Sequence, residues 1–144
     1  QIQVMSAGSG VKHSEFNPSK TERLHLIQVW IMPDRANLKP RYAEWTPTPE
    51  QLDAPKVLII SNDGREGSAH ISQDADVYRV KTQTGGTVSH DLRKGRGLWF
   101  QLIGGDVEVG GVQLSPGDAV KSEDAGTFAF KSTGPIEALL FDLA

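Results

Sequence analysis

Short strand-like segments recur through most of this chain, and this recurrence limits the possible folds more than any other feature. From Val57 to Asp142, apolar or alternating segments follow at intervals of about 8–12 residues, separated by glycine, proline and aspartate. No segment carries the apolar period of a helix over three turns. The pattern predicts an all-β protein built as a sandwich or barrel. The predicted strands are Val57–Ser61, His70–Ile71, Val77–Lys81, Thr87–Leu92, Leu98–Ile103, Asp106–Val109, Ala119–Lys121, Thr127–Lys131 and Ile136–Asp142.

Two tight turns give the most specific local signal. Gly110-Gly111 lies between two short strands and suits a hairpin turn that needs positive φ at both central residues. Pro116-Gly117-Asp118 follows, with a glycine for the turn and an aspartate whose carboxylate can cap it. We expect Val107 and Val109 to face the core and Glu108 to face solvent. This arrangement resembles the cupin jelly roll, a double-stranded β-helix.

Composition excludes several classes of function. The 144 residues carry 15 Lys and Arg against 18 Asp and Glu, which argues against a basic nucleic-acid-binding surface. No apolar run is long enough to span a bilayer, so no membrane partner is expected. Cysteine is absent, which excludes a disulfide scaffold and a thiolate site and fits a reducing compartment. With no leader-like segment following Gln1, we expect a cytoplasmic protein.

The N-terminal part contains three further predicted strands, Gln1–Ser6, Val11–Phe16 and Leu24–Ile31, the last covered on both faces. Side chains two residues apart on a strand share a face, so His13 and Glu15 are expected to point the same way. An imidazole and a carboxylate side by side are suitable ligands for a divalent first-row metal. The alternative is an exposed strand dipeptide, and two ligands alone are too few for a stable site.

The same residues carry a resemblance to a known family. The segments Ser6–Asn17 and Leu24–Ile31, with Pro33, resemble the second half of the N-terminal cupin of pirin-like proteins. The closing segment Ala138–Asp142 resembles the end of their C-terminal cupin. In that family, two cupins pack together, and the N-terminal one holds iron through a His-x-His pair and a His-x-Glu pair. The resemblance implies that His13 and Glu15 are metal ligands for Fe(II) or another first-row metal, with Glu15 also a candidate catalytic base.

The sequence departs from the family pattern because it contains no His-x-His motif. It looks like the C-terminal part of a pirin-like protein, beginning partway through the first cupin. The expected organisation is residues 1–36 as the closing strands of an incomplete N-terminal cupin, 37–55 as an ordered connection, and 56–144 as a C-terminal cupin without metal ligands. Open strand edges near the N-terminus are expected to associate with another chain or with a missing N-terminal segment.

The resemblance leaves three functions open. The first is a quercetin 2,3-dioxygenase-type oxidoreductase acting on a flavonol-like aromatic substrate, provided that the N-terminal half is present. The second is a non-catalytic binding or co-regulator protein that does not contact nucleic acid directly. The third is an inactive fragment with half of the metal site. Cupins host many functions, so the fold does not choose among them.

Several other residues receive plain structural interpretations. Trp30, Trp45 and Trp99 are expected in the core, as are Val120 and Phe130, whose replacement by alanine should cost about 1–4 kcal/mol. The remaining histidines, His25, His70 and His90, are isolated, and His90 and Asp91 cannot pair with each other because strand neighbours point to opposite faces. Arg93-Lys94-Gly95-Arg96 is interpreted as a solvated turn, and Thr48-Pro49-Glu50-Gln51 as the capped start of a short helix.

Overall fold

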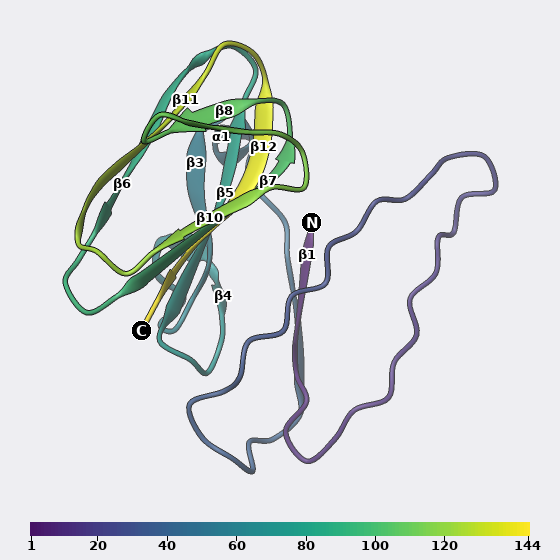
Figure 1. The fold of residues 1–144 in the computed structure, drawn as a ribbon. Coiled ribbons are helices and arrows are strands. Elements are labelled where there is room, and N and C mark those ends of the chain that lie inside the picture. Colours follow the sequence, from purple (N-terminus) through teal and green to yellow (C-terminus); the bar gives the residue numbers. More distant parts are fainter.

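A computed structural model describes all residues, 1–144, and its main body is a sandwich of two mainly antiparallel sheets (Figure 1). The larger sheet has six strands in the order β10-β7-β12-β5-β3-β4, and the smaller has four in the order β6-β11-β8-β9. Most neighbouring strands come from distant parts of the chain. The all-β jelly roll predicted from the turns is therefore confirmed. Its strands are β3 (Lys56–Ser61), β4 (Ala69–His70), β5 (Ala75–Thr82), β6 (Gly86–Leu92), β7 (Gly97–Gly104), β8 (Val107–Val109), β9 (Val112–Leu114), β10 (Ala119–Ser122), β11 (Gly126–Ser132) and β12 (Ile136–Leu143).

The main core lies between the two sheets. Alternate residues of β5, β6, β7, β11 and β12 point inward, as the period of two requires, and thirteen buried apolar residues form one cluster. Phe100 and Phe130 are completely buried, and their rings stack at a centroid distance of 4.0 Å. Val107 and Val109 belong to the same cluster, while Glu108 is only partly buried. The predicted inward face of β8 is confirmed.

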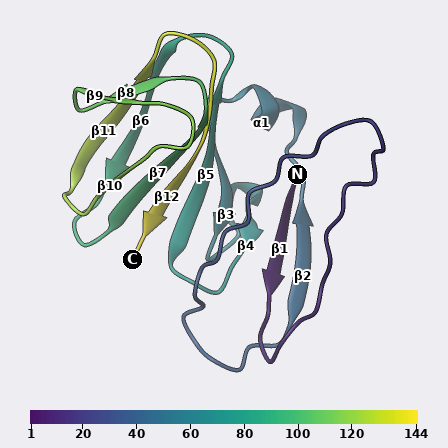
Figure 2. The same cartoon turned by 45° about the vertical axis from the view of Figure 1, so that its right-hand side comes forward.

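A third sheet, of two strands, packs against the outer face of the six-stranded sheet. Strands β1 (Ile2–Ser6) and β2 (Arg41–Trp45) pair in antiparallel register, with Ile2 opposite Trp45. Ile2 and Val4 pack with the buried Trp45 against Val77 and Phe141, whose side chains leave the larger sheet on the side away from the main core. Figure 2 shows this pair of strands beside β3 and β4. Strand β2 is not predicted from the sequence, because the prolines on both sides of it leave no sustained alternation of apolar and polar residues.

The local turn and capping predictions are also confirmed. Gly110 and Gly111 have φ of 58° and 81°, and the Asp118 carboxylate accepts a hydrogen bond from the Ser115 backbone N–H at 2.8 Å. Helix α1 (Pro49–Asp53) starts with Thr48 as N-cap and Pro49 in its first turn. The Thr48 and Gln51 side chains form the reciprocal bonds of a capping box. A one-turn 3-10 helix, η1 (Arg65–Gly67), follows β3. No helix of this protein combines the length and apolar character that a membrane span requires.

Two of the predicted N-terminal strands are wrong. Val11–Phe16 and Leu24–Ile31 contain no strand residues, and residues 7–40 form a long open loop that extends away from the sandwich (Figure 1). A strand needs a neighbour to satisfy its backbone N–H and C=O groups, and no segment of the 144 residues pairs with these two. Their apolar side chains are consequently exposed, with Phe16 at 78% and Trp30 at 86%.

Three other core and surface assignments need correction. Trp45 is buried as predicted, but Trp30 lies in the open loop and Trp99 is 41% exposed on β7. Trp99 alternates with Leu98 and Phe100, which occupy the inward positions of that strand, so its side chain points outward. Arg96 closes the turn after β6, but its side chain is not solvated, because it is 9% exposed and ion-paired.

Gly105 provides a direct test of the turn between β7 and β8. Its φ is 81°, and a Cβ added there would come 2.2 Å from the Pro135 backbone oxygen. We expect Gly105→Ala to lower the free energy of unfolding by at least about 1–3 kcal/mol, through both the clash and the positive φ. Gly110→Ala is the matched control, since its φ is 58° but nothing lies within 4 Å of the added Cβ. Urea unfolding of both variants measures the loss of unfolding free energy. An equal loss in the two variants would contradict the role of the close contact between residue 105 and the Pro135 backbone oxygen.

Candidate functional sites

The predicted metal ligands His13 and Glu15 lie in the open loop rather than on a strand. Both residues are exposed. The His13 Nδ1 atom lies 3.1 Å from the Met5 sulfur, while Glu15 makes no ion pair. The expectation that a strand would hold both side chains on one face is therefore wrong for this chain, because the strand itself is not formed.

The chain contains no group of three or more His, Cys, Asp or Glu side chains arranged to hold a metal ion. His13 and Glu15 have the right donor chemistry, one imidazole nitrogen and one carboxylate. They supply only two ligands, however, and nothing in the fold orients them. These 144 residues do not by themselves provide a complete metal site.

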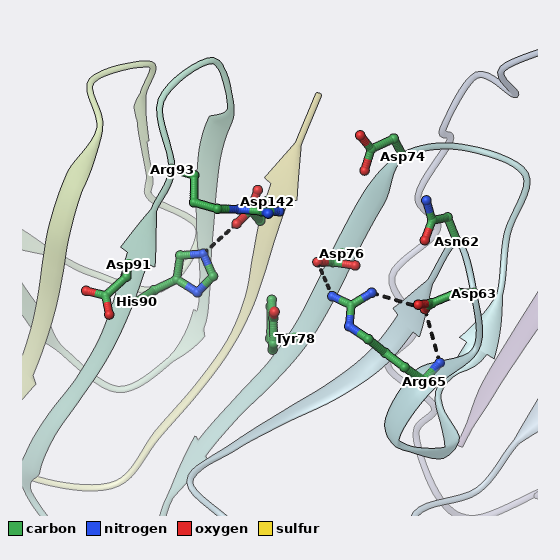
Figure 3. Close-up of a pocket in the computed structure, with 10 residues that line it drawn as sticks. All are labelled: Asn62, Asp63, Arg65, Asp74, Asp76, Tyr78, His90, Asp91, Arg93 and Asp142. Atoms are coloured by element: carbon green, nitrogen blue, oxygen red, sulfur yellow. Dashed lines mark hydrogen bonds and ion pairs between the residues drawn. The ribbon is translucent and has the colours of Figure 1, made fainter.

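A polar pocket of about 490 Å³ opens at one end of the sandwich (Figure 3). Its walls come from the loop after β3, from β5, from the end of β6 and from the end of β12. Tyr78 is its one hydrophobic lining residue, so the pocket is polar although it borders the apolar core. The lining residues are Asn62, Asp63, Arg65, Asp74, Asp76, Tyr78, His90, Asp91, Arg93 and Asp142.

On one side of this pocket, Asp142 connects a histidine and an arginine. Its Oδ2 lies 2.9 Å from Nε2 of His90, and both side chains are only 6% exposed. Its Oδ1 accepts from Nε of Arg96, whose guanidinium also bonds to the Asp142 backbone oxygen and to Asp74. Burial opposes the charge on Arg96, but the hydrogen bond from Arg96 to Asp142 favours it, and the pKa of Arg96 is raised. Both oxygens of Asp142 are thus occupied.

On the other side, Arg65 pairs with two carboxylates. Its guanidinium donates to Asp76 and, at 3.1 Å, to Asp63. The hydrogen bond to Asp76 is the largest of several contributions that raise the pKa of Arg65. Beneath this group, the Ser61 hydroxyl bonds to Asp63 at 2.9 Å and to the Ser68 hydroxyl at 2.7 Å. The loop that carries Asp63 and Arg65 is therefore held in place from below.

Tyr78 lies between the two sides of the pocket (Figure 3). Its ring meets the His90 imidazole edge to face, at a centroid distance of 5.2 Å. The Lys56 ammonium lies 5.4 Å from the centroid of the same ring. Partial burial raises the pKa of the Tyr78 hydroxyl and lowers the pKa of Lys56. Tyr78 therefore keeps its proton across the neutral range and can donate a hydrogen bond.

The sequence placed none of these pocket residues in a site. The prediction that His90 does not pair with Asp91 agrees with the geometry, but the actual partner, Asp142, is 52 positions away and was missed. One signal was present, since His90 alternates with the apolar Val88 and Leu92, which places an imidazole on the core face of β6. A polar group at such a position needs a hydrogen-bond partner.

Two sheets closed around one apolar core, with a polar pocket at an open end, define a cupin jelly roll. Residues 58–143 match the family described as quercetinase C-terminal cupin domain, and residues 1–31 match the family described as pirin. The first of these matches covers more than half of the chain, so the chain belongs to the family of the quercetinase C-terminal cupin domain.

Relatives with known names agree with this assignment. A quercetin 2,3-dioxygenase from Escherichia coli K12 is 39% identical over 145 residues, and a pirin-like protein from Caulobacter vibrioides is 29% identical. A solved structure of a bacterial pirin from E. coli, in complex with nickel(II), superimposes with a TM-score of 0.88 at 38% identity. The superposition covers 98% of this chain and 60% of the E. coli chain. The chain spans 61% of the length of the E. coli dioxygenase.

Proposed function

We propose that this chain forms the C-terminal part of a metal-binding, pirin-like protein with quercetin 2,3-dioxygenase-type activity. In this proposal, residues 1–36 complete a first cupin, residues 37–55 connect the two units, and residues 56–144 form the second cupin. His13 and Glu15 supply two of the metal ligands, and the others come from polypeptide outside these 144 residues. The family membership carries the proposal, together with a nitrogen and a carboxylate donor two residues apart.

The metal proposed is a divalent first-row ion, with Fe(II) as the native candidate. Imidazole and carboxylate ligands without sulfur suit Fe(II) and Ni(II), and a nickel(II) complex exists for the E. coli pirin. The substrate proposed is a flat flavonol-like aromatic, after the name of the E. coli relative. In this proposal Glu15 is a metal ligand and, where it dissociates from the metal, the base that takes the proton from the substrate hydroxyl.

The open loop supports the idea that other polypeptide completes the first cupin. Residues 7–40 make few backbone hydrogen bonds and expose a series of large apolar side chains. Such surface is rare on a folded domain unless another part of the protein covers it. The exposed residues of this loop include Val11, Phe16, Leu24, Leu26, Ile27, Val29, Trp30 and Met32.

Calorimetric titration with Ni(II) tests the proposed ligands. We expect the 144-residue chain to bind Ni(II) weakly, with a dissociation constant above about 10 µM, because two ligands leave most coordination positions to water. A chimera that joins the N-terminal part of the E. coli dioxygenase to Gln1 should bind at least about a hundredfold more tightly. His13→Ala and Glu15→Gln should each remove most of that gain, whereas His25→Ala, in the same loop, should not.

The chimera also tests the activity. It should consume quercetin under air after loading with Fe(II) or Ni(II), and the 144-residue chain should not. Tight Ni(II) binding by the chain alone that survives His13→Ala would overturn the assignment of the metal ligands. A folded, metal-loaded chimera without quercetin turnover would instead favour a non-catalytic binding protein, the second function that the family resemblance allows.

A further inference from the structure

One face of the ribbon formed by β1 and β2 points away from the C-terminal cupin. Ile2 and Val4 pack with Trp45 against the cupin, so their sequence neighbours on the two strands lie on the opposite face. Met5 and Tyr42 are partners in the register of the two strands and therefore share this outward face. Figure 2 shows that the open loop leaves the ribbon after β1 and returns to the same end at β2. The loop therefore starts and ends beside Met5 and Tyr42.

The loop brings both predicted metal ligands back to this face. The Nδ1 atom of His13 lies 3.1 Å from the sulfur of Met5. The pKa of the Tyr42 hydroxyl is raised, first by its hydrogen bond to Glu44 at 2.6 Å and also by the charge of Glu15. Since charges act only over short distances in salt solution, Glu15 lies near Tyr42. No strand holds His13 and Glu15, but both lie beside the outward face of the ribbon.

The contact between His13 and Met5 has only one possible direction. A thioether sulfur carries no hydrogen, so the sulfur of Met5 can only accept a hydrogen bond and Nδ1 of His13 must donate it. A neutral imidazole has one N–H group, so Nε2 then keeps its lone pair. A metal ion binds the lone pair of one ring nitrogen, and the hydrogen bond made by the other nitrogen decides which one is available. The contact thus leaves Nε2 of His13 available to a metal.

We propose that Met5 is a positioning residue for the metal site, because it holds His13 in the Nδ1–H tautomer and so assigns Nε2 as the ligand atom. This inference rests on the proposed function, in which His13 is a metal ligand. Met5 comes from β1, which pairs with β2 over five residues, so the acceptor is carried by a regular element although His13 is not. The sulfur is uncharged, and it fixes the tautomer without adding a carboxylate beside the ring.

NMR of the metal-free 144-residue chain measures the tautomer. Long-range correlation between ring protons and ¹⁵N, at about pH 9 where histidine is neutral, distinguishes a ring nitrogen that carries a proton from one that carries a lone pair. We expect the Nδ1–H form of His13 to predominate. The ratio of Nδ1–H to Nε2–H should be at least about threefold higher than for His25, which is exposed in the same loop. The spectrum of His13→Ala identifies the His13 signals.

Two methionine variants separate the hydrogen bond from the packing of the side chain. Met5→Leu keeps the size and apolar character of residue 5 but removes the sulfur acceptor. It should lower the ratio of Nδ1–H to Nε2–H in His13 at least about threefold and leave the ratio of His25 unchanged. Met32→Leu is the matched control at the other methionine of the chain. It should change neither ratio, because the sulfur that His13 contacts is that of Met5.

The Ni(II) affinity of the chimera with the N-terminal part of the E. coli dioxygenase tests the consequence for the metal. Met5→Leu should weaken Ni(II) binding about tenfold, as expected when a metal-bound histidine loses the hydrogen-bond partner of its other nitrogen. Met32→Leu should leave the affinity unchanged. Circular dichroism and urea unfolding of each variant establish that the compared proteins are folded.

The two measurements fail in different ways. A predominantly Nε2–H tautomer of His13 in the wild-type chain, or a ratio unaffected by Met5→Leu, would overturn the role of Met5. An unchanged Ni(II) affinity of the folded Met5→Leu chimera would overturn it as well. Absence of Ni(II) binding by the folded wild-type chimera would instead overturn the proposed function. The metal-free spectra distinguish these failures, because they do not depend on a bound ion.

Discussion

Phe130→Ala is expected to lower the free energy of unfolding by about 3–5 kcal/mol, among the largest effects of any single substitution in this protein. Phe130 is completely buried and stacks on Phe100, which comes from the opposite sheet. Removing its ring takes away apolar burial and leaves a cavity that the two sheets cannot close. Urea or guanidinium unfolding, followed by fluorescence and circular dichroism, measures the loss.

A double-mutant cycle isolates the contribution of the stacked rings. Phe100→Ala and Phe130→Ala together should destabilise less than the sum of the single variants, by about 0.5–1.5 kcal/mol. Val120→Ala should cost only about 1 kcal/mol, because Val120 is partly exposed where β10 ends the larger sheet. A loss below about 1 kcal/mol for Phe130→Ala would contradict the position of the core between the two sheets.

Asp142→Ala is expected to destabilise the chain by about 3–5 kcal/mol. The change leaves the buried Arg96 without its main carboxylate and leaves His90 Nε2 without an acceptor. The penalty arises from these orphaned groups rather than from the value of the ion pair itself. Thermal and chemical unfolding at neutral pH measure it.

Two comparisons show whether orphaned groups cause the loss. Glu137→Ala removes an exposed carboxylate from the other end of the same strand and should change stability by less than about 0.5 kcal/mol. Replacing Asp142, His90 and Arg96 together with apolar residues of similar size should cost clearly less than Asp142→Ala alone. A triple variant that is less stable than Asp142→Ala would show that the buried network itself stabilises the fold. Orphaned polar groups would then not explain the destabilisation by Asp142→Ala.

The sequence by itself determined the fold class and most of the strands between Lys56 and Leu143. These elements depend on local signals: alternation of apolar and polar residues, and turns such as Gly110-Gly111 whose φ values only glycine adopts readily. The capping box at Thr48 and Gln51 is equally local and was predicted to the residue. Local chemistry decides such elements almost independently of the rest of the chain, so one sequence is sufficient to predict them.

Only the tertiary structure decided the N-terminal region and the pocket. Leu24–Ile31 has the composition of a buried strand, yet it forms none, because a strand exists only where another strand satisfies its backbone. Asp142, His90 and Arg96 carry no shared motif, and the sandwich brings them together from β12, β6 and the turn after β6. Pairing between distant strands depends on the whole topology, and the periodicity of one segment does not show which strand it pairs with.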